Sequence, residues 1–267
     1  MFAKLLKYEW KATRKIQTIL ALAILGLGLV GSIVLRLMIR ADYDASVGLS
    51  VLGVISIGVI WLSLAGCVLA SMLLLANRFY KHKFTDEGYL TFTLPVTSHQ
   101  ILWSSIVNFL LWEVIQFAAL MGAGVLFLLI GIGPEMNGMD WADFSAEMSY
   151  MTQELASVTG PVWLNLLLMP ASAVSNVILI LAAITIGSTV ARKHKILTSF
   201  GIYYGLNMVI STLSSVVSTS LVTVQIINGE TPSLWTVTVF SKGINVALGI
   251  GGYLLSEYLI RENLNMS

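Results

Sequence analysis

Long apolar stretches alternate with short polar segments along the whole chain, and six of these stretches contain about 20 or more residues. A helix needs about 20 mostly apolar residues to cross the roughly 30 Å hydrocarbon core of a bilayer. The pattern therefore predicts an all-α membrane protein, a single transmembrane domain over residues 1–267. The six predicted spans are residues 17–39, 47–76, 100–132, 162–190, 196–227 and 234–260.

The positive charges predict the orientation of these spans. Lys and Arg gather before the first span, after the second and after the fourth, whereas residues 133–160 contain neither. Since basic loops stay in the cytoplasm, both termini are expected there. The first apolar stretch exceeds the length of a signal-peptide core, so we expect it to remain in the protein. The basic clusters are Lys4, Lys7, Lys11, Arg14 and Lys15; Arg78, Lys81 and Lys83; and Arg192, Lys193 and Lys195.

Residues 1–16 predict an amphipathic helix that lies in the membrane interface. At 100° per residue the five basic side chains of this segment share one face, and Phe2, Leu5, Leu6 and Ile16 share the other. Glu9 falls on the apolar face, where a carboxylate is costly without a partner. Glu9 either extends to water or pairs with a neighbouring Lys, or it contacts another protein.

Residues 133–160 form the long segment on the opposite side, and they predict a second amphipathic helix. Apolar residues recur there every three or four positions, while the polar face is acidic. This helix either rests on the outer leaflet or meets a cationic amphipathic substrate. The apolar positions are Trp141, Phe144, Met148, Met151 and Leu155, and the acidic ones are Asp140, Asp143, Glu147 and Glu154.

The composition, 57% apolar and 11% charged, excludes an ordinary soluble domain, and a net charge of +1 gives no argument for nucleic acid. The single cysteine, Cys67, lies in an apolar run and predicts no disulfide or cysteine metal site. The sequence contains no phosphate loop, no H-E-x-x-H zinc helix and no G-x-S-x-G elbow. His82, His99 and His194 fall at span ends, where a surface role is expected. We therefore expect no enzyme site and no cofactor in this chain.

Two charged residues stand inside predicted spans, Glu113 in the third and Lys242 in the sixth. Charges near the middle of a bilayer cost roughly 2.5–3.5 kcal/mol unless they are paired or hydrated. Either these two residues pair with each other, or they line a hydrated substrate path. Six amides in the spans are expected to bridge helices: Asn108, Gln116, Asn165, Asn176, Asn207 and Asn245.

Residues 77–99, between the second and third spans, combine apolar and acidic residues. Thr85 is a plausible N-cap with Asp86 and Glu87 in the first turn, and Pro95 ends the segment before the next span. This predicts a short helix across the cytoplasmic face. Such a helix is either a mere connector or, because it offers Tyr89 and Leu90 beside acidic residues, a docking surface for another protein.

The chain resembles the membrane subunits of bacterial ATP-binding-cassette exporters, in particular the short six-helix permeases. Four features carry this resemblance: the basic start LLKYEWKATRK, the loop TDEGYLTFTLPVTSHQIL, six spans with both ends inside, and the length. The resemblance departs from the family where residues 228–233, between the fifth and sixth spans, form a very short connection.

The resemblance implies a place in the bacterial plasma membrane and a separate cytoplasmic ATPase subunit as partner, which binds the ATP and magnesium. It also implies a second copy of the permease in a two-plus-two complex. The residues that it assigns to ATPase docking are Thr85, Asp86, Glu87, Gly88, Tyr89 and Leu90, with Glu9 as an auxiliary.

The resulting hypothesis is a permease that exports an amphipathic peptide, a toxin or a lipid-like molecule. Two alternatives stay open: a membrane scaffold or sensor that transports nothing, and an ion-coupled secondary transporter that uses Glu113 or Lys242.

Overall fold

The structure, a computed structural model, describes residues 2–40, 47–85, 97–132, 141–159, 162–191, 194–229 and 234–264. Nearly all of these residues are helical, and within them six helices are long and apolar enough to cross a membrane. This is the make-up of a multi-pass membrane protein. The helices are α1 (Phe2–Arg40), α2 (Val47–Phe84), α4 (Ser98–Leu126), α5 (Trp141–Thr159), α6 (Val162–Val190), α7 (Lys195–Ile227) and α8 (Leu234–Leu264), with a π-helical turn η1 (Phe127–Ile132) after α4.

The predicted spans agree closely with these helices at most of their ends, but two helices are longer than predicted. α1 contains 39 residues and α2 contains 38, or about 57 Å each at 1.5 Å per residue, which exceeds the hydrocarbon thickness. The amino-terminal segment that was predicted as a separate interfacial helix is the beginning of α1. The position of that segment in the membrane interface and the cytoplasmic place of both termini stay predictions.

The described helices group into two compact units. The amino-terminal unit contains residues 3–75 and 107–140, and the carboxy-terminal unit contains residues 1–2, 76–106 and 141–267. Both α2 and α4 therefore contribute residues to each unit.

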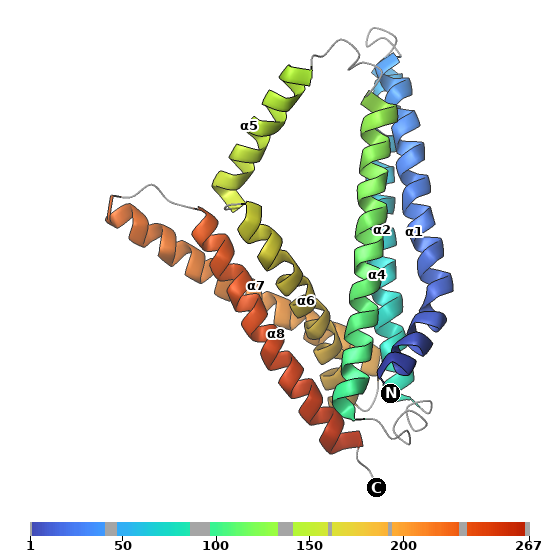
Figure 1. Cartoon of the computed structure of the whole chain (residues 1–267), viewed down its shortest axis with the longest axis vertical. Helices are drawn as coiled ribbons and strands as arrows, with labels where there is room; N and C mark the ends of the chain where they lie inside the picture. The colour runs from blue at the N-terminus through green and yellow to red at the C-terminus, as the bar shows by residue number, and fades with distance from the viewer. Residues whose placement is uncertain are drawn as a thin grey trace. The chain divides into compact units, whose positions relative to one another are not determined.

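In the amino-terminal unit α1, α2 and α4 lie side by side (Figure 1). Small residues on α1 allow the close approach of α4: a Cβ atom added at Gly28 would lie 2.8 Å from the Cα atom of Ala123. The apolar core of this bundle consists of Ala21, Ile24, Leu64, Ala119 and Ala123.

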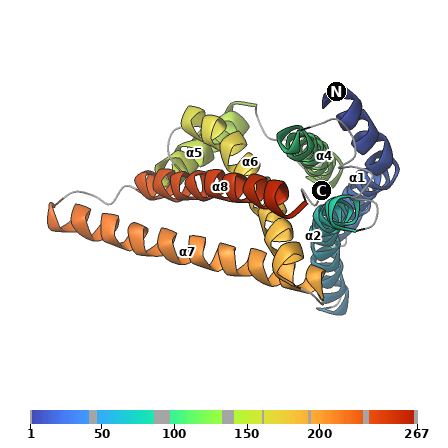
Figure 2. The same ribbon diagram turned by 90° about the horizontal axis from the view of Figure 1, so that it is seen from below.

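In the carboxy-terminal unit α6 packs against both α7 and α8, and α7 and α8 run beside each other (Figure 2). Glycines on α8 bring it close to α6, because a Cβ atom at Gly249 would lie 2.6 Å from Ser175 Oγ. α5 contacts α8 and, more weakly, α6.

α7 is rich in hydroxyl side chains that lie exposed on its surface. These hydroxyls donate to carbonyls three or four residues earlier in α7 itself, as Ser215 does to Thr212 O at 2.9 Å and Thr223 to Thr219 O at 2.7 Å. Bonding of this kind satisfies a hydroxyl without a second helix. The other such donors include Ser211, Thr212, Thr219 and Ser220.

Candidate functional site

The segment predicted to dock a partner, residues 77–99, is described only at its two ends, because residues 86–96 lie outside the described ranges. Five of the predicted docking residues fall there, and their role stays a prediction. They are Asp86, Glu87, Gly88, Tyr89 and Leu90. The described ends show how this segment is held on either side.

The first part of the segment, as far as Phe84, is the packed end of α2. Phe79 and Lys83 are only 5% and 4% exposed there, so one face of the last turns of α2 is buried although these turns extend beyond the predicted span. The ring of Phe84 contacts the rings of Phe79, at a centroid distance of 5.9 Å, and Tyr80, at 6.4 Å. The part of the segment outside the described ranges, residues 86–96, therefore follows a helix end that is fixed by packing.

Thr85 is the one predicted docking residue of this segment that the structure describes. Its hydroxyl donates to the carbonyl of Lys81 at 2.5 Å, a contact that closes the end of α2. An N-cap accepts from the backbone N–H two or three residues later, and these positions lie outside the described residues. The N-cap role of Thr85 stays a prediction.

Near the other end of the segment, Thr97 caps α4. The backbone N–H of Gln100 donates to Thr97 Oγ1 at 3.3 Å, and that of Ile101 donates to Thr97 O at 3.1 Å. This cap was not predicted, although Thr-Ser two residues after Pro95 is a helix-start signal.

The first turn of α4 is fixed to α8 by three aromatic rings. Tyr253 Oη and His99 Nδ1 are 2.5 Å apart, and Trp103 lies within about 6 Å of both rings by centroid. His99 has an exposed side chain, as the sequence predicted, but it also joins two helices. The predicted docking segment thus runs between two anchored helix ends of the carboxy-terminal unit.

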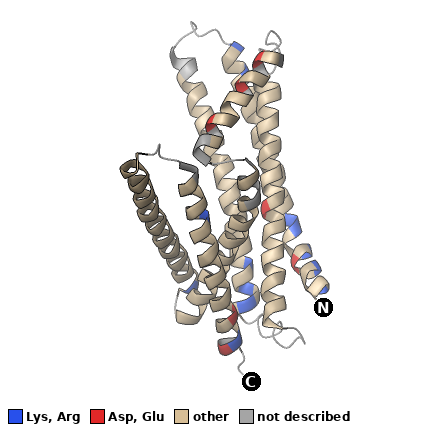
Figure 3. Ribbon diagram, turned by 60° about the vertical axis from the view of Figure 1, so that its left-hand side comes forward, with Lys and Arg blue, Asp and Glu red and all other residues tan. Residues whose placement is uncertain are grey.

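The basic residues at the start of α1 lie together on its first turns (Figure 3), and their side chains are exposed. Phe2, Leu5 and Leu6 are partly buried, and Ile16 is 51% exposed. Glu9 is half-buried, and its carbonyl accepts from Thr13 Oγ1 at 3.1 Å. The auxiliary docking role of Glu9 stays a prediction.

The inward face of the same segment combines aromatic and polar contacts. Trp10 stacks on Trp112 of α4 with a centroid distance of 4.4 Å, and Trp112 Nε1 donates to Thr13 Oγ1 at 2.9 Å. The beginning of α1 therefore packs on α4, which explains why it continues the first helix.

A buried polar cluster, which consists of Thr13, Gln17, Ser71, Trp112 and Gln116, joins all three helices of the amino-terminal unit. Gln17 donates through Nε2 to Ser71 O at 3.1 Å and accepts through Oε1 from Ser71 Oγ at 2.6 Å. Gln116 Nε2 donates to the same Oε1 at 3.1 Å. Each member is at most 5% exposed, so the cluster fixes the register of these helices.

We expect Gln17→Leu to lower the free energy of unfolding by about 1–2 kcal/mol, because Ser71 and Gln116 lose a buried acceptor. Ser32→Ala is the matched control, since the hydroxyl of Ser32 is equally buried but donates only to Leu29 O of its own helix. Thermal unfolding of both variants in detergent measures the difference. Equal stability of the two variants would show that the cluster does not hold the bundle.

The two charges in the spans lie in different units, Glu113 in the amino-terminal and Lys242 in the carboxy-terminal one, and both are half-buried. Their pairing stays a prediction. Glu113 follows Trp112, and the indole of Trp112 donates to Thr13 of α1. Glu113 therefore lies level with the basic residues that follow Thr13 on α1, Arg14 and Lys15. Glu113 therefore lies nearer to the end of the bundle that carries the basic residues than its position within the predicted span 100–132 suggested.

Two residues of α8 close to Lys242 in the sequence make polar contacts with other helices. Ser241 Oγ donates to Ser214 Oγ of α7 at 3.3 Å, and Asn245 Nδ2 donates to Asn176 Oδ1 of α6 at 3.2 Å. Together with Gln116, Asn245 confirms the prediction that amides bridge helices. Asn207 does not follow it, because its Nδ2 donates to Tyr203 O of its own helix.

The acidic segment predicted on the outer side forms α5, which confirms its helical character. Asp143, Glu147 and Glu154 are exposed on α5 (Figure 3), and Asp140 lies outside the described residues. Within the described ranges no three His, Cys, Asp or Glu side chains are close enough to share a metal ion.

Comparisons of the chain with known protein families, with curated proteins and with solved structures found no match.

Proposed function

We propose that this chain is the permease subunit of an ATP-driven exporter in the bacterial plasma membrane, with an amphipathic peptide, a toxin or a lipid-like molecule as its substrate. The observation that carries the proposal is the segment TDEGYLTFTLPVTSHQIL between two membrane helices. It resembles the loop by which exporter permeases bind their ATPase.

The anchored ends of this segment support a docking role. A surface that transmits force to a partner needs a firm base, and preorganised ends lower the entropy that is lost on binding. α2 continues for eight residues beyond the predicted span end at Ala76, or about 12 Å, and its last turns are packed. The other end is held by Thr97 and by the contact between His99 and Tyr253.

The energy source follows from the same proposal. The sequence contains no phosphate loop, so ATP and magnesium are bound by a separate ATPase, and two permeases with two ATPases form the working complex. The substrate path lies between the two permease copies.

Co-expression with an ATP-binding-cassette ATPase from the same genome tests the proposal. We expect the two proteins to co-purify in detergent, and we expect ATP hydrolysis to rise when the permease is present in nanodiscs. An ATPase that neither binds the permease nor responds to it would overturn the proposal.

Vesicle transport separates the alternatives. A complex that forms and hydrolyses ATP but moves no substrate indicates a scaffold or sensor. Transport that persists without ATP and stops when ion gradients collapse indicates a secondary transporter that uses Glu113 or Lys242. An exporter requires ATP and tolerates the loss of the gradients.

A further inference from the structure

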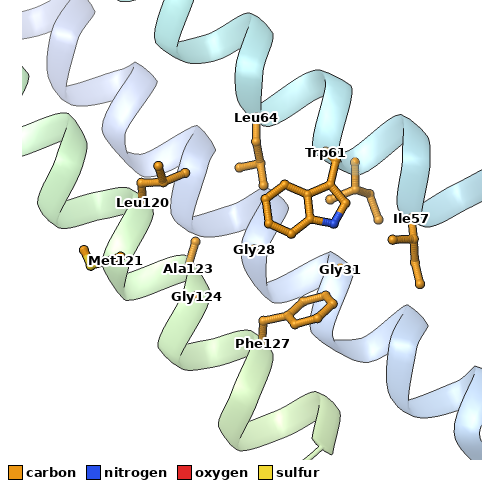
Figure 4. A pocket seen from close by; sticks show the side chains of 11 residues that line it. Gly28, Gly31, Ile57, Trp61, Leu64, Leu120, Met121, Ala123, Gly124 and Phe127 are labelled. Carbon is orange, nitrogen blue, oxygen red and sulfur yellow. The ribbon is translucent and has the colours of Figure 1, made fainter. Parts of the chain in front are cut away.

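A cavity of about 220 Å³ lies between α1, α2 and α4 in the amino-terminal unit (Figure 4). We propose that this cavity binds one acyl chain of a membrane phospholipid. The proposal is independent of the exporter function, because it concerns a different part of the chain and needs no ATPase.

The shape of the cavity follows from the packing of the three helices. α1 and α4 nearly touch at Gly28 and Ala123, and this contact forms the floor. Above it, the rings of Trp61 on α2 and Phe127 on α4 meet edge to face at 6.5 Å. Gly124 also lines the cavity, and no atom lies within 4 Å of the position that its Cβ would occupy.

The chemistry of the lining selects a hydrocarbon ligand. Eleven residues line the cavity, all of them Gly, Ala, Ile, Leu, Met, Phe or Trp, and the only side-chain nitrogen or oxygen among them is Nε1 of Trp61. An apolar cavity of this kind offers water no hydrogen bonds and stays dry, but it binds apolar molecules. A peptide backbone or a charged group would lose its hydrogen bonds there.

The depth of the cavity selects a lipid chain among hydrocarbon ligands. Gly28 is eleven residues from either end of the predicted span 17–39, or roughly 16 Å, and this is near the middle of the bilayer. Trp61 and Met121 are 59% and 53% exposed, so the cavity opens toward the outside of the unit. At this depth the surroundings of a membrane protein are acyl chains.

The volume of the cavity is sufficient for part of one acyl chain. A cavity of about 150 Å³ holds one benzene molecule, so by proportion this cavity has room for roughly eight or nine carbon atoms. The helix at its rim is also irregular, because α4 changes into the π-helical turn η1 at Phe127. Such turns occur frequently at functional sites.

Retention of a labelled lipid tests the proposal. The protein is reconstituted in vesicles of phosphatidylcholine with a diazirine in the middle of one acyl chain, solubilised in detergent, illuminated and digested for mass spectrometry. We expect about one labelled lipid per chain, attached within residues 57–64 or 120–127.

Filling the cavity provides the decisive variant. Gly124→Leu places a side chain in the open space, and we expect at least a fivefold loss of labelling with unchanged or higher thermal stability. Gly26→Leu is the matched control, because Gly26 lies in α1 with equally open space but does not line the cavity. We expect it to label as the parent does.

Three outcomes would overturn the proposal. Equal labelling of Gly124→Leu and the parent would show that the lipid lies elsewhere on the surface. Labelling at many sites without a preferred one would show general contact with the bilayer. If Gly124→Leu converts a dimer into a monomer, and the parent dimer retains no lipid, a side chain of a second copy occupies the cavity.

Discussion

Tyr89→Ala and Leu90→Ala are expected to abolish co-purification with the ATPase, whereas Asp86→Lys and Glu87→Lys weaken it less. Buried apolar anchors contribute most of the energy of an interface, and their truncation costs about 2 kcal/mol or more, a loss of roughly 30-fold in affinity. Charges at the rim mainly alter the rate of association and its dependence on salt. Co-purification and substrate-stimulated ATP hydrolysis measure both effects.

A surface tyrosine elsewhere controls for general effects of truncation. Tyr204 of α7 is 68% exposed, and Tyr204→Ala is expected to bind the ATPase as the parent does. All of these variants should insert and fold normally, since changes at surface positions usually stay within about 0.5 kcal/mol. If Tyr89→Ala and Leu90→Ala still bind and stimulate the ATPase, the segment only connects two spans and the exporter proposal loses its main support.

Gly28→Ala is expected to destabilise the amino-terminal unit by about 3 kcal/mol. The added Cβ would lie 2.8 Å from the Cα atom of Ala123, which belongs to the backbone and cannot rotate away. Overpacking typically costs about 1–3 kcal/mol, and a clash with backbone falls at the upper end of this range. Thermal unfolding in detergent measures the loss.

Gly26→Ala is the matched comparison, because it makes the same change two residues away where no atom lies within 4 Å. Alanine favours a helix by about 1 kcal/mol over glycine, so this variant is expected to equal or exceed the parent in stability. Equal stability of Gly28→Ala and Gly26→Ala would contradict the close approach of α1 and α4.

The spans could be predicted from the sequence because length and apolar composition determine them locally. α6 begins and ends at the predicted residues, 162 and 190, and α7 differs by a single residue at its start. The sequence could not predict that residues 2–16 continue into the first span as one helix. Their pattern is helical whether they form a separate helix or the beginning of α1, and no Gly or Pro separates the two parts. Their direction depends on contacts of Trp10 and Thr13 with α4.

The candidate sites were predictable to different degrees. The amides of Gln116 and Asn245 are visible in the sequence, but their partners, Gln17 and Asn176, depend on how the helices pack. Thr13 and Gln17 occur on one face of α1, four residues apart, and this spacing is the signal that could have identified the polar cluster. The apolar cavity leaves no such signal, because its lining residues resemble those of any membrane helix.

The polar cluster can be completed only after the ribosome has made α4. Gln17 and Gln116, which its bonds join, are 99 residues apart in the chain. At about 5–20 residues per second, a ribosome needs roughly 5–20 seconds to make that stretch. Throughout this interval the amide of Gln17 lacks its α4 partner. We therefore expect the nascent first helix to stay beside the insertion machinery, where water or another protein can bind the amide, until α4 emerges.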